Sequence, residues 1–173
     1  MYCTPVQGFF MIVLGIDPGS RVTGYAAVTR KSGRFHLIEA GTVRSNPKED
    51  IPTRLLSIYS GLYELIGKIK PDSSAIEAIF RYKSSESALR LGQARGVALL
   101  ALAQYDLPIT DYNPMTVKKS VGGSGRAGKK EIIRIVTRLL GLQKDLPSDA
   151  ADAAAIAITH LIHSAFQARI KKR

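Results

Sequence analysis

Apolar residues in the first third of the chain fall into short runs that are typical of β-strands. Met11–Asp17 is an apolar, β-branched run that ends in an acid, and Pro18-Gly19-Ser20 breaks it. Two more strand-like runs follow, Val22–Arg30 and Phe35–Val43, separated by the turn residues Lys31-Ser32-Gly33. Because parallel strands need a longer crossover than these connections provide, the pattern predicts an antiparallel meander of three strands.

After residue 50 the apolar positions change to a helical period. Isoleucine and leucine recur every three or four residues across Asp50–Lys70, which predicts an amphipathic helix ended by Pro71. Brief strands are expected at Ser74–Ala78 and Ile109–Tyr112. Further helices are expected at Ser85–Tyr105, directly after Pro114, at Lys129–Leu140 and at Ser148–Gln167. This order predicts an α/β fold in which helices flank a mixed five-stranded sheet.

The length of 173 residues indicates one domain with a full core. We expect that domain to span residues 11–168, preceded by an irregular, uncharged leader at 1–10 and followed by a basic tail at 169–173. The leader lacks the features of a signal peptide, and no apolar run approaches a membrane span. Cys3 is the single cysteine, which excludes an internal disulfide. These features together predict a soluble, cytoplasmic protein.

Composition adds a strongly basic balance to this picture. Lys and Arg number 25 against 14 Asp and Glu, for a formal net charge of +11. Such a surplus favours a polyanionic partner such as nucleic acid. It is concentrated in Asn113–Lys144, which holds eight Lys or Arg and one acid, Glu131. A solvated helix face is the structural alternative, although the glycine-rich stretch Gly122–Gly128 would let the backbone approach a phosphate closely.

Four acids in this basic chain stand where a metal site would need them. Asp17 ends the first strand and Glu77 lies at the end of the fourth, so the two become neighbours if those strands pair. Asp149 and Asp152 are three residues apart near a helix N-terminus and therefore share one face. Phosphodiester hydrolysis by two Mg²⁺ ions requires such clustered carboxylate oxygens.

Each acid also has a structural interpretation. Asp17-Pro18-Gly19 is an ordinary turn sequence, and Asp149 with Asp152 matches a helix capping box. Glu77 is harder to explain in this way, because a glutamate in a short apolar strand needs a partner. Taken together, the four acids favour the metal site.

Aromatic and cationic residues alternate directly after Glu77, in Phe80, Arg81, Tyr82 and Lys83. Unpaired bases can stack on such rings, at about 1–3 kcal/mol per base. Burial of Phe80 in the core is the alternative. The segment is therefore a candidate nucleic-acid contact.

Four segments of the chain resemble one known family. GIDPGSRVTGY (Gly15–Tyr25), AIEAIF (Ala75–Phe80), LGQARG (Leu91–Gly96) and DAADAAAIAITH (Asp149–His160) are similar, in order and spacing, to motifs of the RuvC family of Holliday-junction resolvases. The resemblance implies a ribonuclease-H-like fold, a homodimer, and Mg²⁺-dependent paired cleavage of four-way DNA junctions in recombination and repair. It also implies cooperation with a branch-migration complex of the RuvA and RuvB type.

The resemblance assigns roles residue by residue. The family's catalytic and metal-binding acids correspond to Asp17, Glu77, Asp149 and Asp152, and its junction-inserting phenylalanine to Phe80. Its DNA-groove lysines correspond to Lys118 and Lys129, and we expect DNA contacts also from Lys119, Lys130, Arg81, Tyr82 and Lys83.

One departure from the family pattern concerns the second lysine. The family often has an acid before it and a glutamine two residues after it, where this chain has Gly128 and Glu131. Lys129 and Lys130 therefore both stay candidates for the working residue.

Gly92 and Gly96 lie one turn apart on the second expected helix. Small residues at that spacing permit close packing, either on the protein's own sheet, which we take as the default, or on a twin helix across a dimer axis.

Two rival functions are weighed against junction cleavage. Asp17-Pro18-Gly19-Ser20 also resembles the first phosphate loop of actin-like ATPases and sugar kinases, but the second lobe and second Asp-x-Gly loop of those proteins are not found in the sequence. A junction-binding protein that does not cut is the other rival, and the presence of all four acids argues against it.

Overall fold

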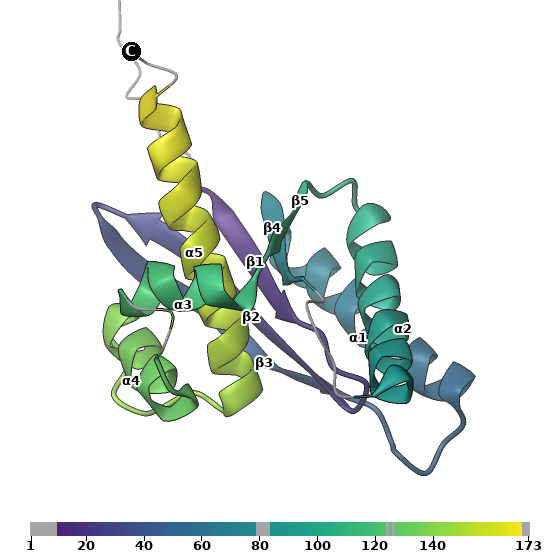
Figure 1. The fold of residues 1–173 in the computed structure, drawn as a ribbon. Helices are drawn as coiled ribbons and strands as arrows, with labels where there is room; N and C mark the ends of the chain where they lie inside the picture. The colour runs from purple at the N-terminus through teal and green to yellow at the C-terminus, as the bar shows by residue number, and fades with distance from the viewer. Residues whose placement is uncertain (1–9, 79–83, 124, 126, 171–173) are drawn as a thin grey trace, which may run out of the picture.

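The computed structural model describes residues 10–78, 84–123, 125 and 127–170. Within this part of the chain, one mixed five-stranded sheet carries helices on both faces (Figure 1). The strands are β1 (Ile12–Asp17), β2 (Val22–Lys31), β3 (Arg34–Arg44), β4 (Ser73–Glu77) and β5 (Ile109–Tyr112). The helices are α1 (Ile51–Ile69), α2 (Ser85–Ala103), α3 (Pro114–Gly122), α4 (Lys129–Leu139) and α5 (Ser148–Ile170).

The strand order in the sheet is β3-β2-β1-β4-β5. β1 pairs antiparallel with β2, and β2 antiparallel with β3, which confirms the meander expected from the short connections. β1 pairs parallel with β4, and β4 parallel with β5. The predicted α/β fold with a mixed five-stranded sheet is therefore confirmed.

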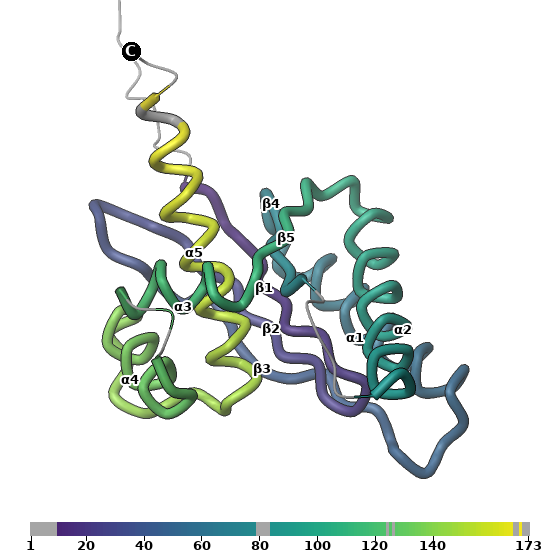
Figure 2. Tube along the Cα trace, in the orientation of Figure 1, coloured from purple at the N-terminus to yellow at the C-terminus, as the bar shows by residue number. Residues whose placement is uncertain are grey.

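Helices lie on both faces of the sheet (Figure 2), and each face buries a hydrophobic core of its own. α1 and α2 cover one face, where their leucines and alanines pack on Leu14, Ile16 and Ile76. α5 covers the other face, and α3 and α4 pack against α5. Because successive side chains of a strand point to opposite faces, each buried strand contributes to both cores.

Local sequence signals fix the ends of the helices. The carboxylate of Asp50 accepts the backbone N–H of Thr53 at 3.0 Å and begins α1, and Lys70 ends that helix in the left-handed conformation before Pro71. Asn113 caps α3 in the same way, through the N–H of Met115 at 2.8 Å. The observed boundaries lie within a residue or two of the expected ones for most elements. α5 differs more, because it continues to Ile170 instead of ending at Gln167.

Among the described residues, no helix combines the length and apolar character needed to cross a membrane.

Candidate metal centre and nucleic-acid interface

Two of the predicted acids meet at the carboxyl ends of adjacent parallel strands. The register pairs Ile16 of β1 with Ile76 of β4, so the next residues, Asp17 and Glu77, end their strands side by side. Ile16 and Ile76 both point into the core beneath α1 and α2. Strand alternation therefore directs Asp17 and Glu77 to the other face, toward α5.

α5 approaches this face unusually closely, because two strand residues are glycines. A Cβ on Gly15 of β1 would lie 2.1 Å from the carbonyl oxygen of Ala153, and one on Gly24 of β2 would lie 2.0 Å from that of Asp149. Gly24 is the β2 residue paired with Asp17. The glycines thus bring the first turns of α5 directly over the end of β1.

The close approach completes a cluster of carboxylates. Asp17, Asp149 and Asp152 each offer an oxygen, and these oxygens all lie within 4.8 Å of one another. The carbonyl of Pro147 accepts the N–H of Ala151, so the helix begins before Asp149. Asp149 therefore lies inside the first turn and not at the cap position that the capping-box interpretation requires.

Burial and repulsion between neighbouring carboxylates raise pKa values within the cluster. Burial, reinforced by Glu77, Asp152 and Asp149, raises the pKa of Asp17 to about 8. Burial and the charge of Asp152 also raise the pKa of Glu77, against a hydrogen bond with Asp17 that lowers it. A nearby cation stabilises the anionic form of carboxylates that are buried beside one another, and their hard oxygen donors suit a divalent metal ion. The arrangement fits a metal site.

Lys129, at the start of α4, supplies positive charge to the cluster. Its Nζ lies 3.2 Å from Oδ2 of Asp152. Burial raises the pKa of Asp152 and the charge of Lys129 lowers it, with a net rise. The backbone N–H of Gly128 donates to the carboxylate of Glu131 at 3.3 Å, which fixes Lys129 as the first residue of the helix. Lys130 is exposed beside it.

A cavity of about 260 Å³ joins the acids to the lysines. Its lining includes Glu77 and Asp152 together with Lys118 of α3 and Lys129 of α4. Lys118 lowers the pKa of both Glu77 and Asp152. Acidic and basic side chains therefore face one shared space, in which a metal ion and a phosphate could lie together.

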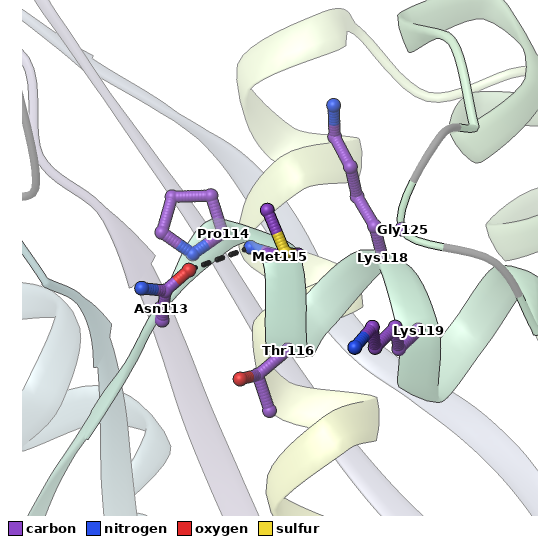
Figure 3. Close-up of a pocket in the computed structure, with 7 residues that line it drawn as sticks. All are labelled: Asn113, Pro114, Met115, Thr116, Lys118, Lys119 and Gly125. Atoms are coloured by element: carbon purple, nitrogen blue, oxygen red, sulfur yellow. Dashed lines mark hydrogen bonds between the residues drawn. The ribbon is translucent and has the colours of Figure 1, made fainter.

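A second cavity, of about 380 Å³, extends this surface along α3 (Figure 3). Pro114 and Lys118 line both cavities, and Lys119 lines the second. Lys118 and Lys119 leave α3 in different directions, and Asn113 caps the helix at the cavity edge (Figure 3). None of the seven residues lining this cavity is acidic. It forms a basic continuation of the carboxylate site.

A buried arginine that was not singled out from the sequence holds the loop after Asp17. The guanidinium of Arg54 on α1 donates to the carbonyl of Ser20 and, at 3.4 Å, to the hydroxyl of Ser45. The Ser45 hydroxyl also donates to the Ser20 carbonyl at 3.0 Å. No sequence pattern singles out Arg54, whereas glycines inside strands, such as Gly15 and Gly24, are a recognisable signal of close backbone approach.

Part of the expected DNA surface lies outside the described residues. Phe80, Arg81, Tyr82 and Lys83 belong to this group, and their expected roles stay predictions. The described chain reaches Ala78, whose N–H donates to the carbonyl of Tyr112 at 2.9 Å.

The expectation that Gly92 and Gly96 pack on the protein's own sheet is wrong. A Cβ on either glycine would meet nothing within 4 Å, so neither packs on the sheet. They lie on an open face of α2 together with Leu89, which is 64% exposed, and Leu100, which is 53% exposed. The spacing of these four residues puts them on one side of the helix. We call this surface the α2 face.

A mixed sheet with clustered carboxylates at the ends of its strands, bordered by a basic cavity, is the arrangement of a metal-dependent nuclease. The sequence comparison specifies the family. The profile of the family described as crossover junction endodeoxyribonuclease RuvC matches residues 13–160. The chain therefore belongs to the RuvC family of crossover junction endodeoxyribonucleases, as its motifs predicted.

Individual relatives agree with this assignment. The crossover junction endodeoxyribonuclease RuvC of Histophilus somni is 46% identical over 158 residues, which cover 90% of this chain and 83% of the relative. The structure of Thermus thermophilus RuvC in complex with a Holliday junction substrate superposes with a TM-score of 0.84 at 35% identity, over 89% of this chain and 94% of that one. The yeast mitochondrial Holliday junction resolvase Ydc2, 16% identical with a TM-score of 0.61 over 85% of this chain and 76% of that one, shares the fold. The predicted activity, that of a crossover junction endodeoxyribonuclease, is confirmed.

Proposed function

We propose that this protein resolves four-way DNA junctions by paired, symmetric cuts that depend on Mg²⁺, during recombination and repair in the cytoplasm. The observation that carries the proposal is the cluster of Asp17, Asp149 and Asp152, with oxygens within 4.8 Å of one another. The closeness of these oxygens suits a hard divalent cation. Family membership supports the four-way junction as the substrate.

In this proposal Asp17, Glu77, Asp149 and Asp152 are the metal ligands and catalytic acids. Two Mg²⁺ ions bound there would supply an activated water and charge stabilisation for the leaving oxygen. The protein's own contribution is to hold four carboxylates together from three elements, β1, β4 and α5. Asp149 or Asp152 also orients the attacking water.

The positive surface beside the acids positions the DNA backbone. Lys118 and Lys129 hold the phosphates next to the metal site, because both line the cavity that also contains Glu77 and Asp152. Lys119 and Lys130 extend the contact along α3 and α4. Arg81, Tyr82 and Lys83, which follow Glu77 closely in the sequence, also contact the DNA, and Phe80 stacks on bases at the opened junction centre.

Paired cuts require two active sites in a fixed relation, which a twofold dimer provides. We assign the dimer contact to the α2 face. Leu89 and Leu100 expose apolar surface there, while Gly92 and Gly96 leave room for a second helix to approach closely. A branch-migration complex of the RuvA and RuvB type would deliver the junction, as in the family at large.

The proposal is tested by incubating the protein with a synthetic four-way junction and with linear duplex of the same sequence, in Mg²⁺ and in EDTA. We expect paired nicks on opposed strands of the junction, in Mg²⁺ alone. Cutting of both substrates at equal rates, or cutting in EDTA, would contradict it.

A further inference from the structure

Arg95 of α2 makes an unusual set of contacts at the end of β4. Its Nε donates to the backbone carbonyl of Glu77 at 3.2 Å. One terminal nitrogen donates to both carboxylate oxygens of Asp111 on β5, at 2.7 Å each. The side chain of Arg95 is 17% exposed and that of Asp111 is 55% exposed. One guanidinium thus joins α2 to two adjacent strands.

These contacts come from the face of the sheet opposite the acids. Tyr112 lies in the core on the α5 side, so its neighbour Asp111 points toward α2. The side chain of Glu77 points to the α5 side, where Asp152 acts on its pKa. Arg95 therefore binds the backbone of Glu77 from the α2 side of the sheet, while the Glu77 carboxylate faces the metal site on the α5 side.

We propose that Arg95 is a positioning residue, which fixes the carboxylate of Glu77 for metal binding by clamping its backbone carbonyl, with Asp111 orienting the guanidinium. β4 ends at Glu77, which pairs with Tyr112 of β5 on one side, whereas its pairing with β1 on the other side ends one residue earlier, at Ile16 and Ile76. Arg95 thus adds a side-chain hydrogen bond to the Glu77 backbone at the point where the pairing with β1 has ended. The inference rests on the proposed role of Glu77 as a metal ligand.

Arginine is required for this geometry. Its planar fork can bind a carbonyl through Nε and a carboxylate through a terminal nitrogen at the same time. A lysine at this position keeps the charge but is a single point donor. Loss of a group that orients a metal ligand typically costs about 10- to 100-fold in metal affinity or activity.

The test measures metal binding without DNA and cleavage with DNA. The variants are Arg95→Lys, Arg95→Ala and Asp111→Asn, with Arg90→Lys as the matched control, because Arg90 also pairs with a carboxylate, Glu86, on α2. Mn²⁺ affinity of the free protein is measured by electron paramagnetic resonance, and single-turnover cleavage is measured across a Mg²⁺ titration. Junction binding in EDTA and the Tm are recorded for each variant.

We expect Arg95→Lys to weaken Mn²⁺ binding and to raise the half-saturating Mg²⁺ concentration by about tenfold or more. Saturating Mg²⁺ should restore most of the rate, whereas mere loss of folded protein would lower the rate at every Mg²⁺ concentration. Asp111→Asn should act in the same direction. The double variant should be little worse than Arg95→Lys alone, because both substitutions disrupt the same set of contacts. Arg90→Lys should leave the metal dependence unchanged.

Unchanged metal affinity in folded Arg95→Lys and Asp111→Asn would overturn the inference, and these two variants decide the matter if Arg95→Ala does not fold. Glu77→Gln separates this outcome from failure of the proposed function. If Glu77→Gln cuts normally, Glu77 is not a ligand and the proposed site is wrong. If Glu77→Gln is inactive while Arg95→Lys binds metal normally, the positioning role alone is wrong.

Discussion

The carbonyl oxygen of Asp149 occupies the space that a side chain on Gly24 would fill, 2.0 Å from the ideal Cβ position. Gly24 also pairs with Asp17 across the sheet. A glycine on β2 therefore determines how closely an aspartate of α5 approaches an aspartate of β1. The geometry of the carboxylate cluster depends on this close contact.

We predict that Gly24→Ala lowers cleavage more than junction binding. The added methyl group must push the first turn of α5 off the sheet, at a cost of about 1–3 kcal/mol in stability. A misplacement of about 1 Å in a catalytic group can reduce the rate about 100-fold. Single-turnover cleavage and chemical denaturation of the same preparation measure both effects.

Gly33→Ala provides the control for that experiment. Gly33 has a φ of +83° in the turn between β2 and β3, and a Cβ there would meet nothing within 4 Å. Alanine should cost about 1 kcal/mol through backbone strain alone. Equal loss of cleavage in the two variants would mean that stability, and not the position of Asp149, explains the effect.

The metal-free protein should lose stability as the pH rises, because of Asp17. Folding raises the pKa of this carboxyl from 3.8 to about 8, so the folded state holds the proton more tightly than the unfolded state. Its contribution to stability is complete below about pH 4 and is lost as the pH rises through about 8. The raised pKa values of Glu77 and Asp152 act in the same direction.

Asp17→Asn should reduce this dependence and leave the part that Glu77 and Asp152 contribute. In EDTA, we expect the variant to have a higher Tm than the unmodified protein at about pH 9 and a similar Tm at about pH 4. Mg²⁺ should raise the Tm of the unmodified protein at high pH but not that of the variant, because a bound ligand stabilises the folded state. A Tm difference that does not change with pH would argue against the buried, repelling cluster.

Lys129 and Lys130 should differ in their effects on catalysis. Lys129 lies 3.2 Å from Asp152 and lines the cavity that contains Glu77, whereas Lys130, which is also exposed, does not line that cavity. Replacing each with methionine removes one charge. We expect Lys129→Met to slow cleavage at saturating DNA about 100-fold, as for loss of a group that stabilises transition-state charge. Lys130→Met should cause a smaller fall, seen mainly as weaker and less salt-dependent binding. The reverse order would assign the working position to Lys130.

The α2 face should control oligomeric state. Leu100→Glu would place a charge in an apolar contact, so we expect a monomer by sedimentation and unpaired nicks on the junction. Leu139→Glu on α4 is the matched control, because this leucine is 36% exposed on the opposite side of the sheet. A dimer that persists in Leu100→Glu would move the contact to another surface.

The main features of the fold could be predicted from the sequence because local signals were consistent. The change from strand-like runs to a helical period gave the order of elements, and the short connections gave the antiparallel meander. The local pattern did not predict the parallel pairing of β1 with β4, and it is this pairing that brings Asp17 next to Glu77. Pairings between distant segments depend on tertiary packing, which local patterns do not encode.

The sequence predicted the acids of the candidate site, but not the residues that hold the backbone around them. Spacing alone put Asp149 and Asp152 on one helix face, yet it could not exclude a capping box, since that choice depends on where the helix begins. The sequence also did not predict the open surroundings of Gly92 and Gly96, because glycine can lie on either the buried or the exposed face of a helix. Arg54 and Arg95 contact backbone carbonyls of distant residues, and such contacts leave no sequence pattern.

The most direct test of the central claim compares Asp149→Asn with Asp145→Asn. Asp149 belongs to the carboxylate cluster, whereas Asp145 is an exposed acid four residues earlier that accepts a hydrogen bond from Thr137 at 2.9 Å. Binding and cleavage of a synthetic four-way junction in Mg²⁺ are measured for both. We predict that Asp149→Asn binds the junction and does not cut it, while Asp145→Asn does both. Normal cleavage by Asp149→Asn would contradict the assignment of the carboxylate cluster as the metal site.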